Sequence, residues 1–445
     1  MSETDPSPAA GPHLPKGLKV TLAIAAAAFL TVCAWLVWAT PVLAPYSDML
    51  DWVARYQDFQ GDGKLGAYLL TPHISHRLVF TFLILWADAA LFGASGWLFV
   101  VVGVSLLALT AALLARAASQ AGEGDLKWVI GGAAAALVLL PGGILDATAH
   151  ICTIYIEALA LSVAAILLAT PSDGEAPTPG RLVLALACAA GAAFGNGAGL
   201  AIWPVLAFSA WRRNRMLGQA ILAGGILFGL AYFSGQAGGA AMHAAGGGGS
   251  GLKRAGLMFL SYLGLPWSLA VPRLGWLLGL VVGALGGWAI LRKGGEEATR
   301  AERIAVQLIQ FSLITALMAA IGRHGPDQPL TAPLRYAVLL SPLHVGLLIL
   351  AAPGLAGVLK RRARETQILL AAAAVLAVLH QAAAGVFVVR TADLNRARAE
   401  AFRAGDRSAL VQAAMYPDTA KAEAMLARMR AAGLYQHEWR TPNGR

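Results

Sequence analysis

A succession of apolar segments, running from residue 18 to residue 388, constrains the fold of this chain more than any other feature. Hydrophobic residues make up 58% of the 445 residues and charged residues only 13%, and the mean hydropathy is +0.63. Soluble domains carry about 25% charged residues, so most of this chain must lie in lipid. We therefore predict an all-α, polytopic integral membrane protein with interfacial helices.

About eleven segments are predicted to cross the bilayer. Two further apolar stretches, Leu78–Phe92 and Ala255–Ala270, can each cross it or lie along its surface as a helix. The turn GNGAG joins two short spans within Leu182–Ala210, because its glycines allow a tight turn. The predicted spans are Leu18–Thr40, Trp97–Ala115, Trp128–Leu145, Ile151–Ala169, Leu182–Phe194, Ala198–Ala210, Leu217–Phe233, Leu274–Leu291, Ile304–Ile321, Tyr336–Ala352 and Ile368–Val388.

Positive charge in the loops predicts the orientation of these spans. Lys and Arg are enriched in short cytoplasmic loops, and the clearest basic loops are Trp211–Arg215, Arg292–Arg303 and Leu359–Thr366. The N-terminus adds Lys16 and Lys19. All of these share one side only if the two further stretches do not cross and Leu182–Ala210 forms two short spans. This arrangement predicts a multi-pass protein of the bacterial inner membrane, with the N-terminus cytoplasmic and the C-terminus periplasmic.

Three regions follow from this pattern. Residues 1–17 form a cytoplasmic tail, and residues 18–389 form the transmembrane domain, in which 41–76 is a first outer loop with an amphipathic helix. Residues 390–445 form a small helical tail at the periplasmic side, too poor in large apolar residues for a core of its own. We expect this tail to pack on the outer face of the membrane domain.

The net charge of +10 is interpreted as loop charge that sets orientation, and no nucleic-acid partner is expected. The three cysteines, Cys33, Cys152 and Cys188, lie in apolar segments and show neither disulfide nor metal-binding spacing.

Three aspartates, Asp48, Asp51 and Asp58, lie on one stripe of the helix predicted by PYSDMLDWVARYQDF, directly after the first span. Ser47 or Asp48 could cap this helix, and Asp51 is spaced to pair with Arg55. The helix is either a surface helix with solvated charges, or it holds Asp48 or Asp51 as a catalytic base or metal ligand at the membrane surface. The spacing does not choose between these alternatives.

The segment TPHISHRLVFTFLILWADAALFG predicts a second polar cluster. His73 and His76 alone are too few ligands for a zinc site. With Arg77 they suit a phosphate, because Arg binds anions in a bidentate manner, or they contact lipid headgroups. Asp88 lies inside an apolar helix and is expected to have a function, since an unpaired carboxylate there is costly.

Polar residues also mark the ends of later spans. Asp146, His150 and Glu157 share one helical face, where they make either structural or functional contacts. Arg323 and Arg335, the latter followed by Tyr336, bracket a loop on the side where positive charge is disfavoured. The two arginines therefore have either a specific anionic partner or a role in headgroup anchoring.

Several of these motifs occur together in a known superfamily. HISHRL leading into LFGASG, then GAGLAIWP, then IGRHG and LRYAVL late in the chain, resemble the polytopic C-type (GT-C fold) glycosyltransferases. Related bacterial membrane proteins often carry Asn-Glu-His-Arg in the early segment. Here the matching stretch is Ile74-Ser75-His76-Arg77, so only His76 and Arg77 correspond.

The resemblance implies an inverting hexosyl or pentosyl transfer, from a polyprenyl-phosphate sugar to a glycan, lipid or protein acceptor at the periplasmic face. Asp48 or Asp51 would be the acidic residue that serves as the catalytic base, or it would be the ligand of a divalent cation such as Mg or Mn. The remaining site residues would bind the phosphate and substrate (His73, His76, Arg77, Arg323, Arg335 and Tyr336) or support the site (Asp88, Asp146 and His150).

Three other functions remain open. A transporter or flippase of a lipid-linked saccharide would use the same arginines, but it should show polar residues across both leaflets and often an inverted repeat. A polysaccharide polymerase or ligase would also work outside the membrane. A non-catalytic scaffold would tolerate neutralisation of both Asp48 and Asp51.

Overall fold

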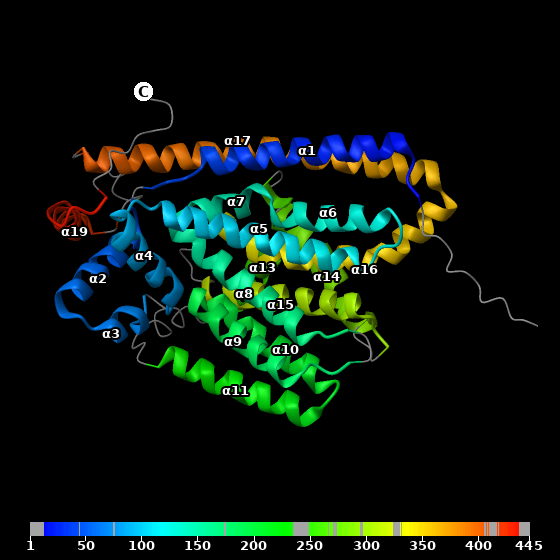
Figure 1. Ribbon diagram of the computed structural model, residues 1–445, viewed down its shortest axis with the longest axis horizontal. Coiled ribbons are helices and arrows are strands. Elements are labelled where there is room, and N and C mark those ends of the chain that lie inside the picture. The colour runs from blue at the N-terminus through cyan, green and yellow to red at the C-terminus, as the bar shows by residue number, and fades with distance from the viewer. Residues whose placement is uncertain are drawn as a thin grey trace, which may run out of the picture.

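The computed structural model consists of helices and connecting loops (Figure 1). It describes residues 13–43, 45–73, 76–172, 175–234, 249–265, 267–269, 274–293, 297–323, 330, 332–404, 406, 408, 416 and 418–435. Within these ranges there is no strand, only two isolated β-bridges, Val42 to Ala149 and His73 to His76. The predicted all-α class is therefore confirmed.

Eight helices among the described residues are long and apolar enough to cross a membrane. A ninth span forms if the bent pair α6 (Leu126–Val138) and α7 (Pro141–Thr148) is counted as one. The eight are α1 (Lys16–Ala39), α5 (Trp97–Ser119), α8 (Thr153–Ala169) with the short η1 (His150–Cys152) before it, α11 (Arg215–Phe233), α14 (Gly275–Lys293), α15 (Arg300–Arg323), α16 (Ala337–Arg361) with η5 (Leu334–Tyr336) before it, and α17 (Ala363–Arg403).

The other apolar helices are shorter. The two short spans predicted in Leu182–Ala210 correspond to α9 (Pro179–Gly195) and to η2 (Gly197–Ala201) followed by α10 (Ile202–Trp211). The turn between them is tight, since a Cβ atom at Gly199 would lie 2.2 Å from the backbone of Ala192. The stretches left open in the sequence form α4 (Val79–Phe92) and α13 (Gly249–Leu263), with η3 (Trp267–Leu269) after α13, and both helices are shorter than the eight long ones.

The basic loops meet at one end of the helix bundle, called here the basic end. Lys360 lies 3.8 Å from Glu123, and Arg300 donates to Gln120 Oε1 at 2.8 Å. Near the start of α1, Lys19 forms a 2.8 Å ion pair with Asp125. These contacts join the loops before α6, α15 and α17, so the one-sided grouping inferred from charge is correct within the described residues.

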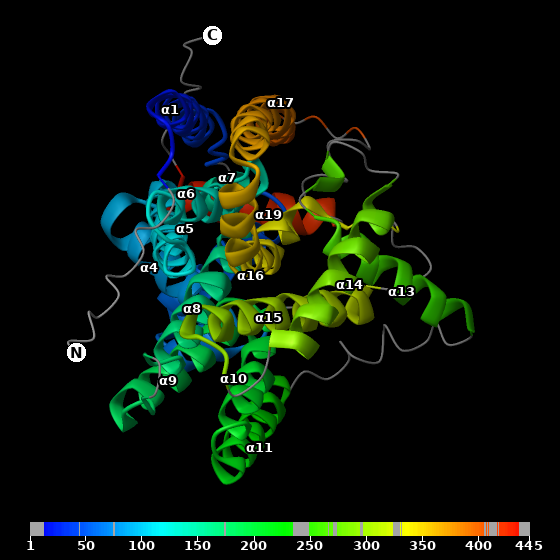
Figure 2. The same cartoon turned by 90° about the vertical axis from the view of Figure 1, so that its right-hand side faces the viewer.

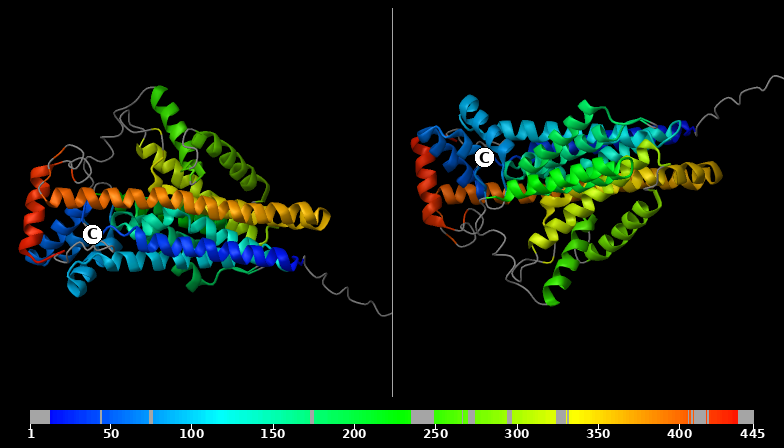
Figure 3. Two further views of the ribbon diagram at one scale, coloured as in Figure 1. Left: turned by 90° about the horizontal axis from the view of Figure 1, so that it is seen from above. Right: turned by 90° about the horizontal axis from the view of Figure 1, so that it is seen from below.

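The opposite end, called here the site end, carries α2 (Asp48–Asp62), α3 (Leu65–Leu70) and α19 (Thr419–Ala431) (Figure 1). Along the length of the bundle, α1 and α17 run side by side as a separate layer, which is clear from the end and from above (Figures 2 and 3). The helix α17 continues without a break through the boundary predicted at 389/390, to Arg403. Its residue Arg396 donates to the carbonyl oxygens of Ala39 and Pro41 at 3.0–3.1 Å, which caps the last turn of α1.

The bend of 51° between α6 and α7 brings α7 against η5. Pro141 begins α7 at the first helical position, where its missing N–H costs nothing. A Cβ atom at Gly142 would lie 3.0 Å from Leu334, so the absence of a side chain there permits the close contact. The bend therefore places Asp146 in the same region as Arg335.

Candidate functional site

The amphipathic helix after the first span is α2, which packs through an apolar stripe of Met49, Trp52, Val53 and Tyr56. It ends at Gly63, whose φ of +67° suits a left-handed cap. At its start Ser47 has a φ of +53°, a strained value for a residue with a side chain, and its hydroxyl makes no capping hydrogen bond. The predicted side-chain cap by Ser47 is therefore wrong.

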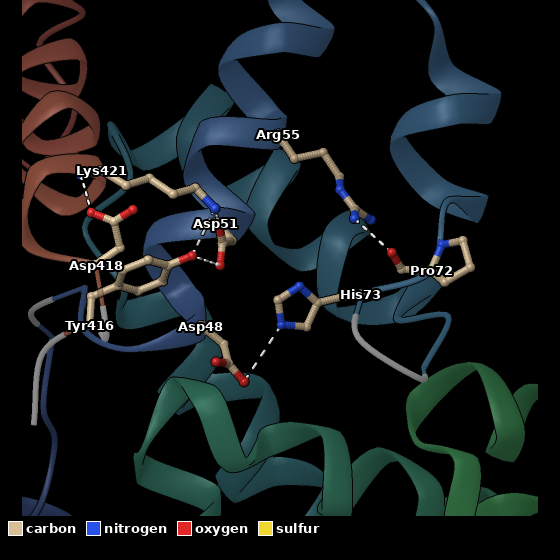
Figure 4. A network of polar contacts seen from close by, with 8 residues as sticks. All are labelled: Asp48, Asp51, Arg55, Pro72, His73, Tyr416, Asp418 and Lys421. Atoms are coloured by element: carbon tan, nitrogen blue, oxygen red, sulfur yellow. Dashed lines mark hydrogen bonds and ion pairs between the residues drawn. The ribbon is translucent and has the colours of Figure 1, made fainter. Parts of the chain in front are cut away.

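Asp48 faces the loop that follows α3. His73 Nε2 lies 3.5 Å from Asp48 Oδ2 (Figure 4), and the His73 ring packs edge-on against Trp52 of the same helix. Partial burial opposes ionisation of Asp48. However, hydrogen bonding and positive charge from His73, together with the charge of Arg335, outweigh it and hold the pKa of Asp48 below its usual value. The Asp48 side chain is still 40% exposed, so an ionised carboxylate is available to a substrate.

Asp51 has a different environment, although it lies one turn further along the same helix. Its carboxylate accepts hydrogen bonds from Tyr416 Oη at 2.6 Å and from Lys421 Nζ at 2.8 Å (Figure 4). The expected pair with Arg55 is not formed, because Arg55 donates instead to the carbonyl oxygens of Thr71 and Pro72. Asp51 therefore binds the C-terminal helix and Asp48 does not.

Two arginines and a tyrosine lie at the start of α16 and the end of α15. Arg323 Nε donates to Tyr336 Oη at 3.1 Å, and the guanidinium lies 5.4 Å from the centre of the Tyr336 ring. The Tyr336 ring also contacts Tyr155 and Tyr262, each at 5.1 Å between ring centroids. The Nε–H group of Arg335 is buried and donates to no group among the described residues. His324 of the IGRHG motif lies outside the described residues.

A second buried carboxylate lies in the same region. Asp146 on α7 is 1% exposed, no N–H or O–H group among the described residues donates to either of its oxygens, and the Cys152 thiol and Arg335 act on it. His76 Nδ1 is also buried, with no hydrogen-bond partner in the part of the chain that the structure describes. Burial, with the positive charges of His73 and Arg323 nearby, lowers the pKa of His76 to about 4, so its ring is neutral at pH 7. Buried polar groups are nearly always satisfied, so these groups mark a place where a polar ligand or water belongs.

Arg77, expected to bind phosphate, is already engaged by the protein. Its guanidinium donates to three carbonyl oxygens, those of Leu70, Tyr232 and Ser234. Its backbone N–H also donates to Tyr232 Oη at 3.0 Å. Arg77 thus joins the segment before α4 to the end of α11, and we leave it out of the phosphate site.

The Arg77→Met variant tests this assignment. It should lower the free energy of unfolding by about 2 kcal/mol. A hydrogen bond from a charged donor contributes about 1.5–3 kcal/mol, and of the three side-chain bonds only the one to Tyr232 is shielded from solvent. Thermal unfolding in detergent measures the loss, with Arg364→Met at an exposed position of α17 as the control. A variant as stable as wild type that binds phosphate lipid more weakly would return Arg77 to the phosphate site.

Asp88 and His150 lie together beside the start of α5. The Asp88 carboxylate accepts from the backbone N–H groups of Gly96 at 2.7 Å and Leu98 at 3.3 Å, and from Ser95 Oγ at 3.2 Å. It therefore serves as the cap of α5, which explains why a fully buried acid is tolerated in α4. The His150 ring stacks on Phe99 at 5.1 Å between ring centroids.

The single helical face predicted for Asp146, His150 and Glu157 is not formed, because extended backbone at Ala149 separates α7, which carries Asp146, from η1 and α8, which carry His150 and Glu157. Glu157 accepts hydrogen bonds from Thr81 Oγ1 at 3.2 and 3.4 Å. It borders an apolar cavity of about 390 Å³ between α4, α5 and α8. Glu157 is therefore paired within the bundle, away from Asp48.

Several residues of this region were not identified from the sequence. Lys421, Tyr416 and Arg396 contact the first outer loop, and Tyr155 and Tyr262 pack on Tyr336. For Lys421, Tyr416 and Arg396, the only indication in the sequence was the polar composition of the C-terminal tail. The two tyrosines sit in apolar segments, where an aromatic residue is typical of any helix interface.

Within the described ranges no group of three or more His, Cys, Asp and Glu side chains could hold a metal ion. Asp48 and His73 provide at most two ligands. A divalent cation at Asp48 would therefore have to take its remaining ligands from a substrate phosphate and water, as Mg²⁺ commonly does.

Comparison with known proteins gives one structural likeness. No protein-family model matches the chain, and no curated protein matches its sequence. The crystal structure of ArnT from Cupriavidus metallidurans bound to undecaprenyl phosphate matches with a TM-score of 0.46 and 14% identity, over 94% of this chain and 76% of that chain.

Proposed function

We propose that this protein is a membrane glycosyltransferase that transfers a sugar from a polyprenyl-phosphate donor to an acceptor at the periplasmic face of the bacterial inner membrane. One observation carries the proposal. The carboxylate of Asp48, whose pKa is held below its usual value, lies within electrostatic range of Arg335, whose buried Nε–H donates to no group among the described residues. A base and an anion-binding group in one place are what a glycosyl transfer with a phosphate leaving group requires.

The chemistry follows from the charges. The acceptor hydroxyl gives its proton to the Asp48 carboxylate as its oxygen attacks C1 of the donor sugar. The bond between C1 and the phosphate oxygen breaks, and the leaving phosphate gains a second negative charge. Arg335, with Arg323 held against Tyr336 beside it, stabilises this charge through charge-assisted hydrogen bonds. Attack opposite the leaving group inverts the configuration at C1.

The location of the site fits a lipid-linked donor. Asp48 lies at the start of α2, directly after the first span, and Arg335 lies in the η5 turn that opens the α16 span. Both are therefore near the level where lipid headgroups meet water, with hydrocarbon along the helices below. A polyprenyl chain would lie in the bilayer and present its phosphate at this level.

Donor consumption in proteoliposomes tests the proposal. Wild type and Asp48→Asn receive a panel of polyprenyl-phosphate sugars, then a panel of nucleotide sugars, each with added Mg²⁺ or Mn²⁺ and with a chelator. Consumption of a polyprenyl-phosphate sugar by wild type alone supports the proposal, and the chelator shows whether Asp48 acts with a cation. Consumption of nucleotide sugars only, or of no donor with glycan, lipid and protein acceptors present, contradicts it.

A further inference from the structure

The two aspartates at the start of α2 have different partners. Asp51 is bound by the C-terminal segment, and Asp48 is not. Asp51, Tyr416 and Lys421 form a closed triangle of contacts at 2.6–2.8 Å, since Lys421 Nζ also donates to Tyr416 Oη at 2.8 Å (Figure 4). The negative charge of Asp51 and the hydrogen bond to Tyr416 raise the pKa of Lys421, so its ammonium stays charged at pH 7.

The contact between α2 and α19 repeats one heptad further on. Arg428 Nη2 lies 2.7 Å from Asp58 Oδ1, and each partner is seven residues beyond Lys421 and Asp51. Residues seven apart lie on the same face of a helix. The two helices therefore pack against each other and run in the same direction. Between the ion pairs, Ala422, Met425 and Met429 of α19 are buried.

The C-terminal part of the chain also binds the end of α1, from which the chain leads on to Asp48. Arg396 binds the carbonyl oxygens of Ala39 and Pro41, where α1 ends and the first outer loop begins. The connection then reaches Ser47, whose strained φ of +53° directly precedes Asp48. Strained residues persist only where the surroundings hold them, and here Arg396 holds the loop before the strain while Lys421 holds the helix after it.

Exposed ion pairs contribute little to global stability, and Lys421 is 53% exposed. The ion pairs between α19 and α2 matter here because they fix the orientation of α2. Asp48 and Asp51 are three residues apart in the first turn of α2, so any rotation of this turn moves both side chains together. Fixing Asp51 to α19 fixes the direction in which Asp48 points.

We propose that the C-terminal segment positions the acid of the site, with Lys421 as a positioning residue that acts through Asp51 to aim the Asp48 carboxylate at the reacting groups. This inference rests on the proposed function for its kinetic test. It concerns Lys421 and Tyr416, which touch neither Asp48 nor Arg335 in any contact found among the described residues.

The kinetic test compares Lys421→Met with Lys421→Arg and with the exchanged pair Asp51→Lys/Lys421→Asp. Lys421→Met should lower kcat about tenfold and leave KM for the donor unchanged, because the phosphate-binding arginines are intact. In Lys421→Arg and in the exchanged pair, kcat should return most of the way to the wild-type value. The matched control is Lys360→Met, which removes an exposed ion pair at the basic end and should leave kcat unchanged. An unchanged kcat in Lys421→Met, or equal losses in Lys421→Met and Lys421→Arg, would overturn the inference.

A second test needs no activity. Asp48→Cys, in a chain whose Cys33, Cys152 and Cys188 are replaced by Ala, is labelled with a membrane-impermeant maleimide with and without Lys421→Met, after thermal unfolding has shown that both proteins fold. Loss of positioning should raise the labelling rate at least fivefold, and an equal rate would refute the positioning role. A raised rate in a protein that consumes no donor would leave Lys421 as a positioning residue while the glycosyltransferase proposal fails.

Discussion

Replacing Asp48 with Asn is expected to lower the rate of sugar transfer about a thousandfold, whereas Asp51→Asn should lower it only about tenfold. General base catalysis contributes about 10²–10⁴-fold, and Asn keeps the shape of the side chain but cannot accept the proton. Asp51 already accepts hydrogen bonds from Tyr416 and Lys421, so its removal disturbs only the direction of α2. Steady-state kinetics with the donor consumed by wild type measures both losses.

The matched control for both variants is Asp62→Asn, an exposed acid in the last turn of α2 that contacts only its neighbour Lys64 among the described residues. It should retain the wild-type rate. The reverse order, in which Asp51→Asn abolishes transfer and Asp48→Asn does not, would make Asp51 the base and the Lys421 contact part of the chemistry. Equal wild-type rates in both variants would favour a scaffold, or a catalytic group elsewhere.

The pH profile gives an independent check on Asp48. Its folded pKa lies below the usual value of 3.8, because the contacts with His73 and Arg335 outweigh its burial. The carboxylate is thus present at and above the usual pKa and is lost only as the pH falls through the lower folded value. Transfer should therefore persist down to about pH 4, and replacing Arg335 by Gln should shift the acidic limb of the profile upward. An unmoved acidic limb in that variant would mean that Asp48 and Arg335 do not share a site.

The membrane architecture follows from the sequence because its physical cause is local. A run of apolar residues long enough to span hydrocarbon forms a helix whatever surrounds it, so α1, α5 and α8 lie where the hydropathy places them. Loop charge likewise predicted that Lys19, Arg300 and Lys360 gather at one end. The continuation of α17 past residue 389 was missed, because a helix that leaves the membrane loses its apolar character but not its hydrogen bonds.

The roles of single charged residues depend on partners far away in the chain, which spacing does not reveal. Asp48 and Asp51 look alike in the sequence, and what separates them is Lys421, 370 residues after Asp51. Arg77 is a residue type that commonly binds phosphate, but here its guanidinium donates to backbone carbonyl oxygens. Every residue carries such an oxygen, so the sequence does not indicate these partners. Asp88 similarly pairs with backbone N–H groups at the start of α5. For Asp88 the sequence correctly indicated that a carboxylate in an apolar helix needs a partner, but for none of these residues did it identify the partner.

Replacing Arg335 with Gln is expected to lower kcat/KM for the donor at least a hundredfold, and to weaken inhibition by free polyprenyl phosphate. Removing one preorganised donor to a developing negative charge costs about 10²–10³-fold in rate, and Arg335 offers a buried N–H group that no protein atom among the described residues accepts. Arg335→Lys should recover only part of the loss, because an ammonium keeps the charge but not the planar, bidentate geometry. Kinetics and product inhibition in proteoliposomes measure both effects.

Arg364→Gln, at an exposed position near the basic end, is the matched control and should behave as wild type. The comparison is decisive because Arg335 also acts on Asp146, whose two oxygens accept from no N–H or O–H group among the described residues. If the guanidinium served only to neutralise that buried acid, Arg335→Gln would destabilise the protein, and the paired change Arg335→Gln/Asp146→Asn would restore both stability and turnover. If it binds the donor phosphate, the paired change restores stability alone, because no positive charge then faces the leaving group.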